Sequence, residues 1–143
     1  MKGLEAVELN LSELENEFTI GSEYYKREFV QIVDELKEAN LKKEDLKNCT
    51  TLITDGDHGS TQYKDSGILY LLSESINEGY IDLKGNGIRY ISKELHNELR
   101  RSLLKPGDVV VTKTGVYYGK SAVIPKEIDE ANTSAHVAKI SID

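Results

Sequence analysis

The fold of this chain is decided by the stretch Leu104-Lys105-Pro106-Gly107-Asp108-Val109-Val110-Val111-Thr112. Proline cannot continue a helix and glycine favours a turn, whereas a run of valines followed by threonine favours a strand. In the preceding segment, residues 92–103, leucines recur at every fourth position, which predicts a helix with Ser92 as its N-cap. The sequence therefore predicts a helix that ends in a proline–glycine turn and leads directly into a strand.

Short runs rich in β-branched and aromatic residues, separated by glycine-containing turns, make up most of the chain after Cys49. Asn86-Gly87 lies between two such runs and is typical of a tight hairpin turn, because both residues tolerate positive φ. We predict strands at residues 52–53, 67–72, 80–83, 88–91, 109–112, 121–124 and 136–142.

The N-terminal part has a helical period instead. An amphipathic helix is predicted over residues 23–39, with Ser22 as its N-cap. It is expected to pack four apolar side chains inward: Phe29, Ile32, Val33 and Leu36. Before it, the alternation of Val7, Leu9 and Leu11 fits a short strand. The predicted fold class is therefore α+β, an N-terminal helix followed by a strand-rich body with one embedded helix.

The composition is that of a soluble globular domain, with 143 residues of which 38% are hydrophobic and 30% charged. No apolar run is long enough to span a membrane, and the N-terminal residues show no secretory signal. Cys49 is the only cysteine, which excludes an intrachain disulfide. We therefore expect a cytoplasmic protein with no membrane contact.

The net charge of −7 argues against binding to nucleic acid, but the charge is unevenly distributed. Residues 84–120 contain eight Lys or Arg and three Asp or Glu, so this segment carries +5 and the remainder −12. A local excess of this kind also fits a solvated helix face. Charge alone leaves both interpretations open.

Three sequence patterns suggest catalytic or metal chemistry without completing it. Asp55-Gly56-Asp57-His58 lacks the later ligands of a calcium loop, which favours a tight loop whose carboxylates accept from the backbone. Gly119-Lys120-Ser121 is too close to Gly115 for a phosphate-binding loop and is followed by a strand-like run. Ser60 near His58 has no strand–serine–helix context. We predict no catalytic residue, no metal site and no cofactor, and hence no enzymatic activity of the chain alone.

A polar, basic and aromatic set on predicted turns remains as the candidate nucleic-acid surface. Such side chains can contact phosphates or base edges. The alternating directions of strand side chains also allow one tyrosine of the set to lie in the core and its neighbour at the surface. The predicted DNA-binding residues are Lys84, Arg89, Lys113, Thr114, Tyr117, Tyr118, Lys120 and Ser121.

Two segments, residues 53–60 and 104–125, carry a resemblance to a known family, together with the runs 67–70 and 90–94 between them. In this order they resemble the target recognition domain of type I restriction–modification specificity subunits, and the related domain of fused restriction–modification enzymes. The resemblance covers roughly residues 46–143. It implies the α+β fold of a DNA methylase specificity domain, double-stranded DNA as ligand, and modification (methyltransferase) and restriction subunits or domains as partners.

The expected organisation is a lead-in with the amphipathic helix over residues 1–45 and a partial target recognition domain over residues 46–143. The family's full domain is expected to continue beyond Asp143, so the chain is expected to be a piece of a longer protein. The alternative is a protein-interaction or assembly module without nucleic-acid contact, in keeping with the overall acidity. An orphan hydrolase that uses His58 is the third interpretation.

Overall fold

The computed structural model of the protein describes residue 8 and residues 25–142. The predicted alternation at Val7, Leu9 and Leu11 and the Ser22 cap lie outside the described residues. The chain forms two compact units, Met1–Lys43 and Glu44–Asp143. Each is described by itself.

The first unit contains the predicted amphipathic helix as α1 (Arg27–Glu38), which begins four residues later than predicted, with Lys26 as its N-cap. Its four apolar side chains are not packed inward as predicted. Phe29, Ile32, Val33 and Leu36 are 45%, 52%, 47% and 56% exposed. The prediction of inward packing was wrong because helical periodicity identifies an apolar stripe but not a partner that would cover it.

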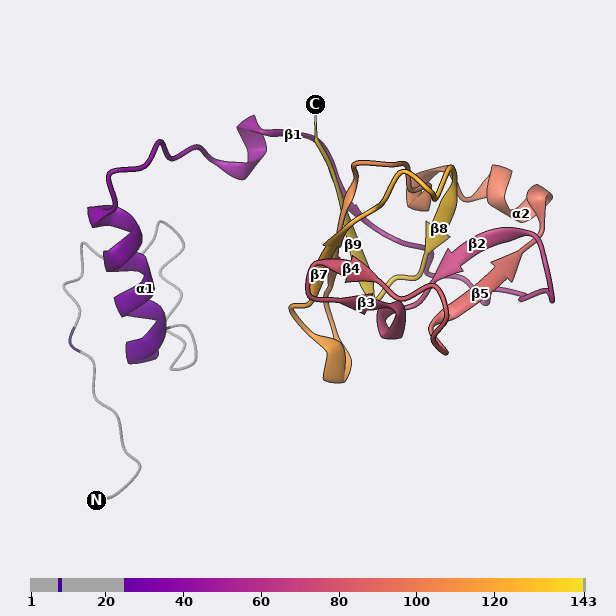
Figure 1. The fold of residues 1–143 in the computed structure, drawn as a ribbon, viewed down its shortest axis with the longest axis horizontal. Helices are drawn as coiled ribbons and strands as arrows, with labels where there is room; N and C mark the ends of the chain where they lie inside the picture. The colour runs from indigo at the N-terminus through magenta and orange to yellow at the C-terminus, as the bar shows by residue number, and fades with distance from the viewer. Residues whose placement is uncertain (1–7, 9–24, 143) are drawn as a thin grey trace, which may run out of the picture. The chain divides into compact units, whose positions relative to one another are not determined.

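The second unit contains a four-stranded sheet with the order β1-β9-β6-β7, in which every neighbouring pair is antiparallel (Figure 1). A short 3₁₀ turn, η2 (Leu46–Asn48), leads into its first strand. The four strands are β1 (Thr50–Asp55), β6 (Val109–Thr112), β7 (Ser121–Val123) and β9 (Val137–Ile142).

A second sheet of three strands has the order β5-β2-β8 and consists of β2 (Ile68–Leu71), β5 (Ile88–Ile91) and β8 (Ala131–Thr133). Between β2 and β5 in the sequence, the turn η3 (Ser73–Ser75) leads into a separate small hairpin, β3 (Ile76–Asn77) with β4 (Tyr80–Ile81). The embedded helix is α2 (Lys93–Glu98), shorter than the predicted helix over residues 92–103, because the chain continues after Leu99 as the 3₁₀ turn η4 (Arg100–Ser102). The predicted α+β fold class is confirmed.

The predicted N-cap of the embedded helix is confirmed, since the Ser92 hydroxyl accepts from the backbone N–H of Leu95 at 3.2 Å. A buried side chain of β8 then holds this helix against the sheet. The Asn132 amide donates to the Leu99 carbonyl at 3.0 Å and the Ser102 hydroxyl at 2.9 Å, and its oxygen lies 2.6 Å from His96 Nδ1. Because the amide N–H groups are used on Leu99 and Ser102, the Asn132 oxygen must accept from His96.

The hairpin predicted at Asn86-Gly87 does not form. β4 pairs with β3, and β5 pairs with β2, so the two strands on either side of this dipeptide are not partners. Gly87 is required for a different reason. A Cβ atom there would lie 2.2 Å from the backbone nitrogen of Ser75, so only glycine allows the close approach in which Leu72 N–H donates to the Gly87 carbonyl at 2.9 Å.

The core of the second unit lies against the inner face of the four-stranded sheet, and one charged residue belongs to that face. In β9, Val137 and Lys139 are buried, whereas Ile140 is half-buried and Ile142 is 54% exposed. Lys139 Nζ contacts Asp108 Oδ2 at 3.1 Å, with the two side chains only 8% and 9% exposed, and it also donates to the Leu103 carbonyl. The apolar residues of the core are Leu71, Ile76, Leu104, Val110, Ala122, Ile124, Ile128, Ala131 and Val137.

Lys139 and Val137 point inward, so Ile140 and Ile142 of the same strand point outward, because neighbouring side chains point to opposite faces. The pairing register then places one residue from each strand in a row across the outer face. Ile53 and Val123, at the two ends of the row, are 52% and 55% exposed. We call this row, Ile53, Ile140, Val109 and Val123, the outer apolar row.

We predict that Lys139→Met lowers the free energy of unfolding by about 3–5 kcal/mol, because it leaves the buried Asp108 carboxylate without its ion partner. The double variant Asp108→Asn with Lys139→Met removes both charges and should recover most of this loss. Urea denaturation measures both effects. Lys105→Met, at an exposed position, is the matched control. A stability loss no larger than that of the control would contradict this account.

Candidate functional site

The topology places the C-terminal ends of β1 and β6 at the same end of the four-stranded sheet. Both strands run antiparallel to β9 and lie on either side of it, so they are parallel to one another. Asp55 is the last residue of β1, and Lys113 immediately follows β6. Both side chains point to the outer face, where Lys113 reaches across β9 to Asp55.

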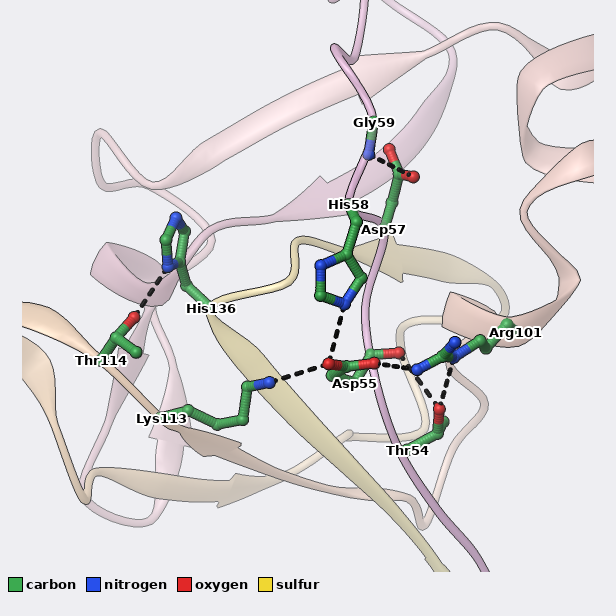
Figure 2. A network of polar contacts seen from close by, with 9 residues as sticks. All are labelled: Thr54, Asp55, Asp57, His58, Gly59, Arg101, Lys113, Thr114 and His136. Atoms are coloured by element: carbon green, nitrogen blue, oxygen red, sulfur yellow. Dashed lines mark hydrogen bonds and ion pairs between the residues drawn. The ribbon is translucent and has the colours of Figure 1, made fainter.

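Asp55 holds three basic side chains, which approach it from different directions (Figure 2). Lys113 Nζ lies 2.9 Å and His58 Nε2 2.8 Å from Asp55 Oδ2. Arg101 contacts Asp55 Oδ1 and also donates from Nε to the Thr54 hydroxyl at 2.8 Å. We call Asp55, His58, Arg101 and Lys113 the Asp55 cluster.

The basic side chains of the Asp55 cluster remain accessible although they are tethered. The Asp55 side chain is 18% exposed, whereas those of Lys113, His58 and Arg101 are 36%, 63% and 67% exposed. The hydrogen bond from Lys113, and next that from His58, hold the pKa of the Asp55 carboxyl well below its usual range. Asp55 is therefore a fixed negative charge that positions cations at the surface.

Neighbouring loops are joined to this cluster by further hydrogen bonds (Figure 2). Lys113 N–H donates to the His136 carbonyl at 2.8 Å, and the Thr114 hydroxyl lies 2.7 Å from His136 Nδ1. Asp57 Oδ1 accepts from Gly59 N–H at 2.9 Å, which is the carboxylate-to-backbone arrangement expected of this loop. A depression of about 250 Å³ beside the cluster is lined by Gly56, Asp57, His58, Glu98, Leu99, Arg101 and Ser102.

The β6–β7 hairpin ends in a projecting turn, residues 113–120, that we call the hairpin tip (Figure 1). The buried Thr112 organises it. Its hydroxyl donates to the Tyr117 carbonyl and accepts from Lys120 N–H, the latter at 3.0 Å. Lys120 Nζ lies over the Tyr117 ring, 5.2 Å from its centroid, and 3.4 Å from Asn77 Oδ1. The tip is thus held by both backbone and side-chain contacts.

The structure brings together six of the eight residues predicted to bind DNA. Five of them are in the hairpin tip, and Ser121 begins the strand that follows it. Neither Tyr117 nor Tyr118 occupies the core. Tyr117 is half-buried in the 3₁₀ turn η5 (Gly115–Tyr117), and Tyr118 is 76% exposed. The six residues are Lys113, Thr114, Tyr117, Tyr118, Lys120 and Ser121.

Arg89 and Lys84 lie elsewhere in the unit. Arg89 belongs to β5, donates to the carbonyls of Asn86 and Ile88 at 2.6 and 2.7 Å, and lies 5.9 Å from the Tyr63 ring centroid. Lys84 N–H donates to Asp82 Oδ1 at 3.0 Å. Within residues 25–142, no hydrogen bond or ion pair joins either residue to the hairpin tip.

Sequence reasoning did not assign Arg101 or His136 to this surface, and it considered Arg101 only as part of a positive segment. For the loop that contains Asp55, the family resemblance suggested a structural or DNA-facing role, but the sequence did not indicate the three basic partners of Asp55. The missing information was the strand order. β1 and β6 are more than 50 residues apart in the sequence and become neighbours of the same strand, β9, only in the folded sheet.

Among the described residues, no group of three or more His, Cys, Asp or Glu side chains is arranged to hold a metal ion. The described part of the chain also has no helix long and apolar enough to cross a membrane. Comparison of the sequence with models of known protein families finds no match, and comparison with curated proteins finds none.

We predict that Asp55→Asn makes stability less dependent on pH in the acidic range. Because the folded-state pKa of Asp55 is lowered, its contribution to stability is fully present above the unfolded-state pKa of about 4 and is lost as the pH falls toward the folded-state pKa. The stability difference between wild type and variant should therefore be constant near neutrality and shrink below about pH 4. Thermal unfolding over a pH series measures it, and a difference that does not change with pH would contradict this role.

Proposed function

We propose that the second unit is a DNA recognition module that directs a restriction–modification complex to its target, like the target recognition domain of a type I specificity subunit. The observation that carries the proposal is the convergence of polar, aromatic and basic residues on one end of the four-stranded sheet. The hairpin tip supplies Lys113, Lys120 and the tyrosines, and the Asp55 cluster adds Arg101. These are the side-chain types that contact phosphates and base edges.

The Asp55 cluster suits phosphate contacts because its cations are held in a fixed orientation and still have free hydrogen-bond donors. Lys113 and Arg101 contribute two positive charges and Asp55 one negative charge, which leaves +1 before any charge on His58. A lysine ammonium has three donors and an arginine guanidinium five, so hydrogen-bonding capacity remains after the contacts with Asp55 and Thr54. Phosphate contacts of this kind position a protein on the duplex.

The proposed partners are double-stranded DNA and the modification and restriction subunits or domains of the complex, in the cytoplasm. One recognition domain contacts only part of a split target, so the isolated chain should bind weakly. We expect a dissociation constant near the non-specific range of about 10⁻⁴ to 10⁻⁶ M at physiological salt.

We predict that Lys120→Glu weakens duplex binding and lowers the slope of log affinity against log salt by about one unit, because one phosphate contact is lost. Lys113→Gln should act in the same direction without placing a second carboxylate against Asp55. Titration of a labelled duplex at two salt concentrations measures both quantities.

The matched control for this titration is Lys126→Glu. It makes the same change of charge at an exposed lysine beyond the opposite end of β7, where Ile124 pairs with Gly107. Equal affinities for the wild type, Lys120→Glu and Lys113→Gln would exclude the hairpin tip as the DNA-facing surface.

We also predict that the purified chain neither cleaves nor methylates DNA, because its sequence contains no complete catalytic constellation. Incubation with plasmid DNA, Mg²⁺ and labelled S-adenosylmethionine tests both activities. Cleavage or methyl transfer that persists after repeated purification and is lost in His58→Ala would instead support a catalytic role for the Asp55 cluster.

A second candidate function, a protein-interaction or assembly module, is favoured by the outer apolar row. Exposed apolar patches mark association surfaces, and sheets commonly pack face to face. The row is free of charge, which suits contact with the same face of a second copy despite the net charge of −7. Sedimentation velocity separates the two functions: concentration-dependent association lost in Val123→Lys, without duplex binding, would favour assembly.

A further inference from the structure

The hairpin tip exposes two large apolar side chains to solvent, where they do not contribute to the core. Val116 is 91% exposed and Tyr118 76% exposed, and these are the two most exposed large apolar side chains among the described residues. Both follow or precede a glycine with positive φ, Gly115 at +79° and Gly119 at +83°. These conformations turn the chain sharply at each side of the tip.

The exposure is a property of a fixed turn. Thr112 anchors the turn through its hydroxyl, and Gly119 N–H donates to the Thr112 carbonyl at 2.9 Å. Tyr118 N–H donates to the Gly115 carbonyl at 3.2 Å across the turn itself. An unanchored loop could fold its valine back onto the protein, whereas this one holds Val116 away from it. A rigid projecting apolar group costs little entropy to insert into a partner.

The charges around the tip indicate what kind of partner it fits. The segment Gly115-Val116-Tyr117-Tyr118-Gly119 has no charged residue, and it is bounded on both sides by lysines, Lys113 and Lys120. Lys120 is additionally aligned over the Tyr117 ring. An uncharged apolar wedge between two cations matches a duplex groove, where phosphates line both edges and the bases lie between them.

We propose that the hairpin tip enters a groove of the DNA duplex and that Val116 and Tyr118 contact the bases there, separating or locally unstacking a base step. Lys113 and Lys120 meet phosphates on either side of the groove. This inference rests on the proposed DNA-recognition function and deepens it. It assigns to the tip a role in deforming the duplex, which makes binding sensitive to how easily a sequence is unstacked.

The test uses the full chain and mixed-sequence duplexes that carry 2-aminopurine, a base whose fluorescence increases when it is unstacked. Wild type should raise the fluorescence on binding. Val116→Ser and Tyr118→Ser should abolish the rise, and Tyr118→Ser should weaken binding roughly five- to hundredfold if its ring stacks on a base. Tyr118→Phe retains the ring and should behave as wild type.

The matched control is Val123→Ser, which makes the same change at an exposed valine of the same hairpin, outside the tip. Circular dichroism verifies that each variant is folded. One outcome is that Lys120→Glu weakens binding while Val116→Ser and Tyr118→Ser bind as wild type and keep the fluorescence rise. The proposed insertion of the tip between bases is then wrong and the DNA-recognition function stands. If wild type binds no duplex, both are wrong. Tip-dependent binding to phosphatidylserine vesicles in place of duplex would overturn the inference in favour of a membrane surface.

Discussion

The buried ion pair between Lys139 and Asp108 is the constraint on which the arrangement of the second unit depends. β9 lies in the interior of the four-stranded sheet, between β1 and β6, so the direction of its side chains sets the faces of both neighbours. A strand that placed Ile140 and Ile142 inward would leave Lys139 outside and turn the whole sheet over. Pairing Lys139 with Asp108 makes the opposite orientation possible, because an unpaired buried ammonium would be strongly disfavoured.

The candidate site follows from this orientation. With Lys139 inward, Asp55 and Lys113 fall on the outer face at the edge where β1 and β6 end, and they are close enough for a contact of 2.9 Å. Arg101 reaches the same carboxylate from η4, which the buried Asn132 anchors by donating to the Ser102 hydroxyl. The outer apolar row and the Asp55 cluster therefore both follow from which face of the sheet the side chains of β9 point to.

Local sequence signals predicted the elements well and their partners poorly. The β-branched run Val109–Thr112 is a strand with the predicted bounds, and Ser92 caps its helix as expected. Strands β3 and β8 were missed, because Ile76–Asn77 is too short and Ala131–Thr133 too weak in β propensity to be recognised. The hairpin predicted at Asn86-Gly87 was wrong because the glycine is required for the close approach of its backbone to Ser75. In the sequence, this tertiary requirement looks the same as the local requirement of a hairpin turn. The sequence could not predict that Lys139 points inward for the same reason: its partner, Asp108, immediately precedes β6 and is distant in the sequence.

The proposed DNA-facing surface is compatible with an acidic chain because screening by salt makes electrostatic interactions short-ranged. At physiological ionic strength, charges separated by more than about 8 Å are largely screened, so the local arrangement outweighs a net charge of −7. Here the +5 segment includes both lysines of the hairpin tip and Arg101. Asp55 reduces the net positive charge of this surface but fixes Arg101 and Lys113 in place. In the proposed complex this would lower the entropy lost when the two cations contact phosphates. In the proposed complex, the uncharged tip between the lysines would add contacts that salt does not screen. Sequence dependence would then come from the free-energy cost of deforming the duplex around the tip.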